Sequence, residues 1–194
     1  MNRLVFATHN DNKVKEVKAI LPPEIDLVSL TDIECHEDIP ETASTLEGNA
    51  LLKATFVKEK YNLDCFADDT GLEIEALDNE PGVYSARYAG PERNAHLNMD
   101  LVLHKLQSHP NRKARFVTSI VLLHQGKQYT FTGICNGKIT QKKSGTQGFG
   151  YDPIFQPEGY DKTFAELSIE EKNKISHRGK AFTQLIEFIK NTIS

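Results

Sequence analysis

The chain has 194 residues, of which 39% are hydrophobic and 26% charged, a balance typical of a globular protein with one substantial core or two lobes sharing a sheet. The formal net charge of −4 argues against sequence-independent nucleic-acid binding, which requires a basic surface. The three cysteines lack CxxC spacing and no apolar run approaches ~18 residues, so we expect no zinc site, disulfide framework or membrane span, and a cytoplasmic location.

The first half of the chain alternates strand and helix patterns. The predicted elements are a strand at 3–7, a helix at 13–21, a strand at 26–30, an irregular acidic segment at 33–44 and a helix at 46–61. Residues 64–67 then predict a strand that ends in Asp68-Asp69-Thr70-Gly71, with residues 72–76 continuing beyond a turn.

The second half continues this alternation. It predicts a helix at 94–106, a hairpin of 115–123 and 128–135, an added strand at 138–141, a glycine-rich loop at 144–152, a short helix capped by Ser168 with Glu171, and a final helix. The final helix presents one apolar face, made of Phe182, Leu185, Ile186, Ile189 and Ile193. These patterns favour one α/β unit with a mixed sheet that can bend into two lobes.

Polar residues follow the first strand in the order Thr8-His9-Asn10-Asp11-Asn12-Lys13. A helix N-terminus with a lysine in its first turn can hold a phosphate tail through backbone N–H groups and the ammonium. The P-loop pattern is absent, however. The alternative is a capped turn with Lys13 in solvent.

Two adjacent carboxylates, Asp68 and Asp69, end an apolar strand. Their proximity is costly unless a cation or proton compensates it, and Mg²⁺ prefers carboxylate oxygens and brings phosphates with it. The alternative is a simple Asp-Asp-Thr-Gly turn between strands. Upstream, Glu41 lies in the acidic segment and Lys53 on the next helix, where solvated charges are the alternative.

Two further segments are rich in groups that could recognise a base. In the glycine-rich loop, Phe149 and Tyr151 could stack on a base and Asp152 could accept hydrogen bonds from a base or sugar, whereas a tight loop with core aromatics is the alternative. Lys172, His177 and Arg178 form a donor-rich cluster, for which a charged turn between helices is the alternative.

Taken together, the sequence resembles the inosine/xanthosine triphosphate pyrophosphatase family. Six segments carry the resemblance, in the family's order and over nearly the whole chain: THNDNK (8–13), NALLKA (49–54), ADDTGLEI (67–74), PGVYSARYAG (81–90), GFGYDPIF (148–155) and EKNKISHRGKA (171–181). Asn12 stands where the family usually has glycine, Gly48 where a glutamate is commoner, and Thr70 where serine is frequent.

The resemblance implies a single domain over residues 1–194, with an elongated two-lobed α/β fold around a mixed central β-sheet, flanking helices and the active site in the cleft. It also implies a homodimer that binds a purine nucleoside triphosphate and Mg²⁺, without nucleic-acid or membrane partners. The implied catalytic residues are Asp69, Asp68 and Lys53, and the implied metal ligands are Asp69 and Glu41. The implied substrate-binding residues are Thr8, His9, Asn10, Asp11, Asn12, Lys13, Thr70, Phe149, Gly150, Tyr151, Asp152, Lys172, His177 and Arg178.

The expected reaction is hydrolysis of ITP, dITP and XTP to the monophosphate and pyrophosphate, with ATP a poor substrate. Either Asp68 or Asp69 would orient and deprotonate the attacking water, and these two roles stay open. Lys172 or Arg178 would donate to the purine C6 oxygen, where adenine presents an amino donor instead. Two other interpretations are a pyrophosphatase for modified pyrimidine or canonical nucleotides and a catalytically silent nucleotide sensor.

Overall fold

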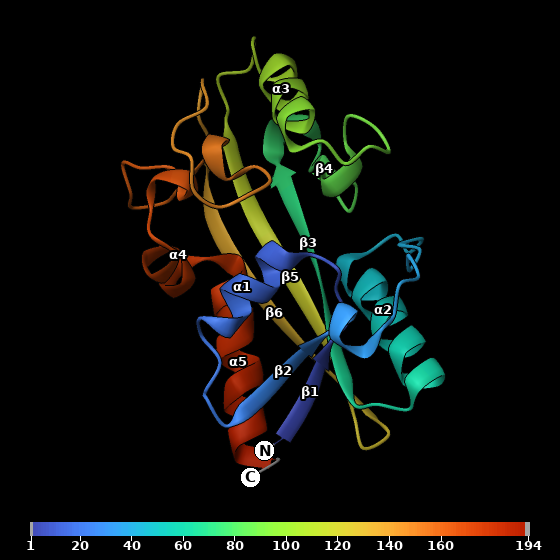
Figure 1. Ribbon diagram of the computed structural model, residues 1–194. Coiled ribbons are helices and arrows are strands. Elements are labelled where there is room, and N and C mark those ends of the chain that lie inside the picture. The colour runs from blue at the N-terminus through green and yellow to red at the C-terminus, as the bar shows by residue number, and fades with distance from the viewer. Residues whose placement is uncertain (1, 193–194) are drawn as a thin grey trace. The chain divides into compact units, whose positions relative to one another are not determined.

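The computed structural model describes residues 2–192, which form a mixed β-sheet with flanking helices (Figure 1). The strands are β1 (Asn2–Phe6), β2 (Ile25–Ser29), β3 (Cys65–Ile74), β4 (Pro81–Gly82), β5 (Lys113–His124), β6 (Lys127–Ile139) and β7 (Phe155–Pro157). The helices are α1 (Asp11–Lys18), α2 (Leu46–Tyr61), α3 (Ala95–Lys105), α4 (Ile169–Ile175) and α5 (His177–Thr192).

The strand order in this sheet is β2-β1-β3-β5-β6-β7, and β4 pairs with β3. Strand β1 is parallel to both β2 and β3, whereas β4 is antiparallel to β3 and β7 is antiparallel to β6. The predicted mixed α/β sheet is therefore confirmed. Within residues 2–192, no helix combines the length and apolar character that a bilayer crossing requires.

The chain divides into two compact units. Of the described residues, unit 1 contains 2–69, 118–133 and 178–192, and unit 2 contains 70–117 and 134–177. Strands β3, β5 and β6 each contribute residues to both units.

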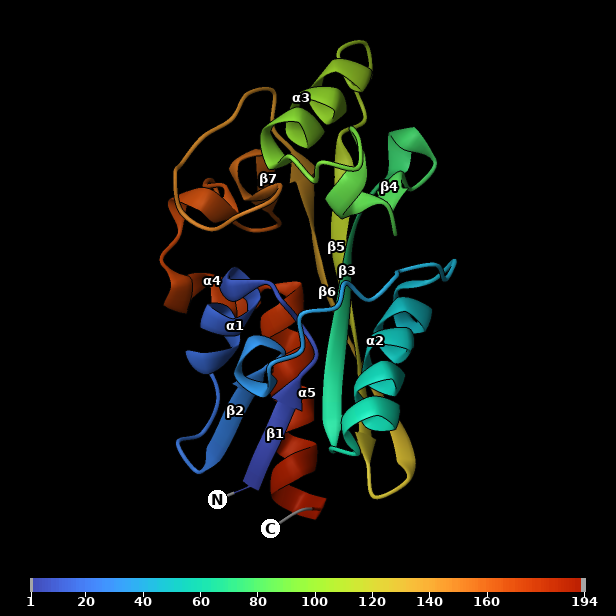
Figure 2. The same cartoon turned by 45° about the vertical axis from the view of Figure 1, so that its right-hand side comes forward.

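In unit 1, helices cover both faces of the sheet (Figure 2). Side chains alternate between the faces of a strand. On β1, Leu4 and Phe6 pack against Phe182 of α5, whereas Val5 packs with Ala54 of α2. Strand β3 follows the same rule, because its side chains also join the two clusters alternately. Unit 1 is therefore a three-layer arrangement, with α1 and α5 on one face and α2 on the other.

In unit 2, one apolar cluster joins the sheet to α3 and to the segment 151–167. Phe116 of β5 stacks on Phe164, with ring centroids 6.1 Å apart, and contacts Phe155 of β7 at 4.7 Å. Met99 and Val102 of α3 join the same cluster. Aliphatic side chains packed around these phenylalanines thus form a core of unit 2 that is distinct from the clusters of unit 1.

Several expected boundaries were wrong. Helix α1 begins at Asp11 rather than Lys13, because the Asn10 side chain accepts hydrogen bonds from the N–H groups of Asn12 and Lys13 and so caps the helix two residues earlier. It also ends at Lys18, before the expected limit. The expected added strand at 138–141 is the end of β6, which stops at Ile139.

Other expectations were confirmed. Helix α2 has the predicted bounds, the β5–β6 hairpin turns at Gln125-Gly126, and Ser168 with Glu171 forms the predicted capping box of α4. On α5, Phe182 and Leu185 are fully buried, as predicted. The predicted member Ile193 of this apolar face lies outside the described residues.

Candidate functional site

The Asp68-Asp69 pair lies within a continuous strand. The expectation of a turn at 68–71 was wrong, because β3 runs unbroken from Cys65 to Ile74. Alternation along this strand therefore directs the two carboxylates to opposite faces of the sheet. Asp68 lies on the face covered by α1 and α5, because its partners come from those helices, and Asp69 lies on the face covered by α2, which supplies its partner Asn49.

Asp68 is bound between two cations. One carboxylate oxygen accepts from the Lys13 ammonium of α1 at 2.7 Å, and the other accepts from Nε of Arg178 of α5 at 3.3 Å. Glu16 of α1 forms a second ion pair with the Arg178 guanidinium. Burial opposes the ionisation of Asp68, but these cations lower its pKa to about 2. Asp68 is therefore a fixed anion that organises the basic groups around it.

Asp69 has a different environment. Its Oδ2 accepts from the side-chain amide of Asn49 at 3.0 Å, and its Oδ1 lies 3.9 Å from the Lys53 ammonium, both on α2. Lys53 is 2.7 Å from Glu41, so the carboxylates of Asp69 and Glu41 share this cation. Burial raises the pKa of Asp69. The cations Lys53 and Lys13 oppose this shift, whereas the Glu41 carboxylate adds to it. The alternative that these charges are merely solvated is wrong.

The Lys53 and Lys13 ammonium groups respond differently to this neighbourhood. Burial tends to lower the pKa of Lys53, yet Asp69 and Glu41 raise it above its ordinary value. Burial also lowers the pKa of Lys13, and Asp68 only partly offsets this because Lys53 and Arg178 are nearby cations. An added anion beside Lys13 would therefore stabilise its charged form.

The loop before α1 supports Lys13. Parallel pairing aligns Phe6 with Phe66, so Thr8 follows β1 at the level where Asp68 lies on β3. Asn10 is the N-cap of α1, and its backbone N–H donates to the Thr8 hydroxyl at 3.1 Å. The interpretation of Lys13 as a solvated residue is wrong, since its side chain is only 12% exposed.

The remaining loop residues are more open to solvent. His9 pairs through Nε2 with the Glu37 carbonyl at 3.0 Å, and Asp11 and Asn12 are exposed in the first turn of α1. Hydrogen bonding to Asn10 already engages the N–H groups of Asn12 and Lys13. Of the residues in this loop, Lys13 is thus the one whose charged side chain is held beside Asp68.

In unit 2, Asp152 and Lys172 form a buried ion pair at 2.6 Å, although Asp152 begins a short 3-10 helix and Lys172 lies on α4. The same Asp152 oxygen accepts from the Phe149 N–H at 2.8 Å, and the Lys172 ammonium lies 5.1 Å from the Phe149 ring centroid. Gly148 has φ +73°, and a Cβ there would collide with the Asp152 carboxylate. The loop therefore requires glycine at this position.

Three other expected base-pocket residues, and the expected substrate-binding residue Thr70, lie in unit 2 with distinct surroundings. His177 is buried and stacks on Phe116, with ring centroids 4.5 Å apart. Tyr151 belongs to the apolar cluster and donates to the Ser85 carbonyl at 2.7 Å. Gly150 has φ +64° and Thr70 is half-buried in β3. The expected turn between helices is present, because Ser176 joins α4 to α5, but Lys172 and His177 are buried on either side of it rather than solvated.

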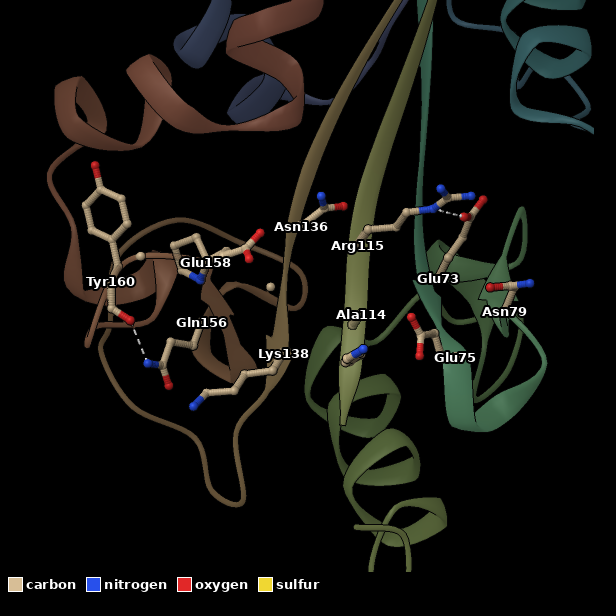
Figure 3. A pocket seen from close by; sticks show the side chains of 14 residues that line it. Glu73, Glu75, Asn79, Ala114, Arg115, Asn136, Lys138, Gln156, Glu158 and Tyr160 are labelled. Atoms are coloured by element: carbon tan, nitrogen blue, oxygen red, sulfur yellow. Dashed lines mark hydrogen bonds and ion pairs between the residues drawn. The ribbon is translucent and has the colours of Figure 1, made fainter. Parts of the chain in front are cut away.

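A separate hollow of about 700 Å³ also lies in unit 2 (Figure 3). Its lining mixes acidic and basic side chains, among them the Glu73–Arg115 ion pair, whose atoms are 2.6 Å apart. Lys138 and Tyr160 line the same hollow. It includes none of the residues that the sequence predicts for the site.

Sequence reasoning missed Glu16. This residue is 5% exposed, unlike most glutamates, and it follows Lys13 by one helical turn on the same side of α1. The spacing of three residues from Lys13, next to the buried Val17, was the sequence signal that could have predicted the role of Glu16. Its carboxylate holds Arg178, which in turn contacts Asp68.

Comparison with known proteins identifies the family. The model of the Ham1 family matches residues 4–188, and this chain therefore belongs to the Ham1 family. A curated relative from Flavobacterium johnsoniae, named dITP/XTP pyrophosphatase, is 60% identical and covers 98% of this chain and 99% of the relative. A relative of the same name from Porphyromonas gingivalis is 52% identical, covering 97% of this chain and 98% of its own.

Solved structures agree with the fold. The Ham1 protein of Staphylococcus aureus has a TM-score of 0.88 and 39% identity, covering 98% of this chain and 99% of that chain. A HAM1 protein from Coxiella burnetii has a TM-score of 0.90 and 36% identity, covering 99% of this chain and 100% of that chain. The similarity thus extends over both units.

Proposed function

We propose that this protein hydrolyses the non-canonical purine nucleoside triphosphates ITP, dITP and XTP to the nucleoside monophosphate and pyrophosphate. The reaction would remove deaminated purines from the nucleotide pool before they enter DNA and RNA. The buried cluster of unit 1 carries the proposal, because Lys13 and Lys53 lie there beside Asp68 and Asp69. Lysines stabilise phosphate oxygens, and a carboxylate can take a proton from water. The names of the relatives supply the substrate class.

Glu41 and Asp69 are the residues that we propose as ligands for Mg²⁺. Glu41 contributes to the raised pKa of Asp69, which indicates repulsion between two carboxylates that share Lys53. A divalent cation would relieve this repulsion, so the residues fit the ion. Within residues 2–192, no group of three or more His, Cys, Asp or Glu side chains could hold a metal. Mg²⁺ commonly takes one or two carboxylates plus phosphate and water, and in this protein it would neutralise charge on phosphate oxygens.

We assign the general base to Asp69 rather than to Asp68, which separates two roles that the sequence leaves open. Lys13 and Arg178 lower the pKa of Asp68 to about 2, whereas burial raises the pKa of Asp69, so Asp69 is the stronger base of the two. Asp69 instead accepts from the neutral amide of Asn49, with Lys53 farther away at 3.9 Å. Asp69 would orient a water toward the α-phosphorus and receive its proton, while Lys13 and Lys53 stabilise the phosphate oxygens.

Base selection is assigned to unit 2. Lys172 is a donor held by Asp152 and lies next to the Phe149 ring, which could stack on a purine. Hypoxanthine and xanthine carry an oxygen at C6 that can accept from Lys172, whereas adenine presents an amino group. The contacts of Arg178 with Asp68 and Glu16 favour Lys172 over Arg178 as the C6 donor. The mismatch between the Lys172 ammonium and the adenine amino group can lower kcat/KM for ATP by up to about 10⁴-fold relative to ITP.

Replacement of Lys172 by methionine is expected to reduce this discrimination. The kcat/KM for ITP should fall because the C6 oxygen loses its donor, while the kcat/KM for ATP should fall less. The ratio of kcat/KM for ITP to that for ATP should therefore decrease at least tenfold, which corresponds to about 1.4 kcal/mol. Steady-state kinetics with both nucleotides provides the measurement. Lys174→Met is the matched control, since Lys174 is exposed on the same helix. An unchanged ratio in Lys172→Met would show that Lys172 does not select the base.

Incubation of the purified protein with Mg²⁺ and a nucleotide panel tests the function itself. We expect ITP, dITP and XTP to give monophosphate and pyrophosphate, separated by chromatography, and ATP to react poorly. Release of diphosphate and orthophosphate would place cleavage at the γ-phosphate and contradict the proposal. Comparable turnover of ITP and ATP would contradict the specificity, and preferred turnover of modified pyrimidine triphosphates would identify a different substrate class. Homodimer formation and a cytoplasmic location stay predictions alongside these.

A further inference from the structure

Ser119 of β5 carries a buried hydroxyl to which the proposed function has given no role. Its side chain is 5% exposed, and its Oγ has no hydrogen-bond partner among residues 2–192. Native proteins rarely leave a buried hydroxyl unsatisfied, and such a group often marks an ordered water or a functional role. The position of Ser119 in the sheet indicates which role this is.

Two side-chain contacts define the register between the neighbouring strands β3 and β5. Just before β3 begins, Asp64 contacts His124 at the end of β5, with 2.7 Å between Oδ2 and Nδ1. Near the other end of β3, Glu73 contacts Arg115 near the start of β5 (Figure 3). The strands are therefore antiparallel, and both contacts fit one register.

Counting inward from either contact leads to the same pair of residues. Five positions from Asp64 along the chain and five back from His124 reach Asp69 and Ser119. Four positions inward from the Glu73 contact reach the same two residues. Ser119 thus lies directly opposite Asp69, where Cβ atoms of paired residues are about 4.5–5.5 Å apart.

Both side chains face the same helix. Val121 of β5 packs with Ala67 of β3 in the cluster beneath α2, and Ser119 and Asp69 are each two residues away from these, on the same face. The Asn49 amide of α2 binds Asp69 on this face. Ser119 therefore lies on the same face of the sheet as Asp69, to which we assign the chemistry.

We propose that Ser119 is a positioning residue of the reaction centre, whose hydroxyl holds the Asp69 carboxylate in its working orientation through one ordered water. A buried water is stable where it has two to four polar partners, and Ser119, Asp69 and Asn49 supply them. The proposal rests on the role proposed above for Asp69. It assigns to Ser119 no contact with the nucleotide.

Removal of the hydroxyl is expected to separate activity from stability. In Ser119→Ala, kcat should fall about tenfold, while KM should change less than about twofold. A tenfold loss is at the lower end of what is seen when a hydrogen-bond partner of a functional side chain is removed. The melting temperature should stay unchanged or rise, because alanine removes a polar group that finds no partner in the protein. Ser119→Thr retains a hydroxyl and should keep most of kcat, whereas the equally large Ser119→Val should behave like alanine.

Val121→Ala is the structural control on the same face of β5. It removes buried apolar volume, so its melting temperature should fall while kcat is retained at a temperature where it stays folded. Parent-like kcat in Ser119→Ala, or equal impairment of the threonine and valine variants, would overturn the proposal. A crystal structure supplies a readout besides activity, since a water within hydrogen-bond distance of both Ser119 and Asp69 is expected and direct contact with apolar atoms alone would contradict it. All ratios refer to the parent, whose own product analysis tests the proposed function separately.

Discussion

Replacement of Asp69 by asparagine is expected to lower kcat for ITP by about 10²–10⁴-fold, the usual contribution of a general base. Asparagine preserves the size of the side chain and can still accept from Asn49, but it cannot take a proton from water. It also removes one of the two carboxylates that we propose for Mg²⁺. The measurement is the rate of pyrophosphate release at saturating ITP and Mg²⁺, with folding checked by circular dichroism.

Asp64→Asn is the matched control for this variant. Asp64 is an acidic residue just before the same strand, and it pairs with Lys58 at 2.9 Å on the surface side of unit 1. The same change of charge at that position should leave kcat within about twofold of the parent, because the partners of Asp64 are Lys58, His124 and Gln125, none of which we place in the chemistry. If Asp69→Asn retained parent activity, Asp69 would have no part in the chemistry.

Much of the fold follows from sequence periodicity. The α2 pattern was predicted with its observed bounds because Ala50, Ala54 and Val57 repeat at helical spacing and are all buried. The α1 start was misplaced because the capping hydrogen bonds of Asn10 depend on its extended backbone and side-chain oxygen, which apolar periodicity does not report. Local sequence patterns therefore predict the presence of a helix better than they predict its first and last residues.

The Asp68-Asp69 pair shows where sequence reasoning stops. Asp and Gly favour turns locally, yet pairing with neighbouring strands overrides this preference and keeps β3 straight through both carboxylates. Once the strand is known, alternation separates the two side chains. Their partners come from α1, α2 and α5, and a spacing of 110 residues between Arg178 and Asp68 leaves no local signal. Pairings of this kind follow from topology and could not be predicted from the residues alone.

Replacement of Asp68 by asparagine is expected to lower the free energy of unfolding by about 3–5 kcal/mol at pH 7, because it leaves buried cations without their counter-charge. Lys13 would lose its carboxylate partner, whereas Arg178 would retain Glu16. Urea denaturation followed by circular dichroism measures this difference. We expect the loss to exceed any effect of Asp69→Asn on stability, because Asp69 accepts from a neutral amide.

The same substitution predicts a pH dependence. The pKa of folded Asp68 is lowered to about 2, below its ordinary value of 3.8. A depressed folded-state pKa stabilises the protein fully above the unfolded value, and this stabilisation is lost as the pH falls from about 4 toward 2. The difference in unfolding free energy between the parent and Asp68→Asn should therefore narrow across that window. A difference independent of pH would show that ionised Asp68 is not its source.

The double variant Asp68→Asn/Lys13→Met distinguishes charge compensation from simple packing. If Asp68 stabilises the fold by neutralising Lys13, removing both charges should recover part of the lost stability, since no buried ammonium is left unpaired and methionine fills similar space. Activity should remain low, because the phosphate then lacks its lysine. Additive losses of stability in the double variant would instead mean that the two side chains contribute independently. The Asp68–Lys13 ion pair would then not be what positions the Lys13 ammonium for the proposed anionic substrate.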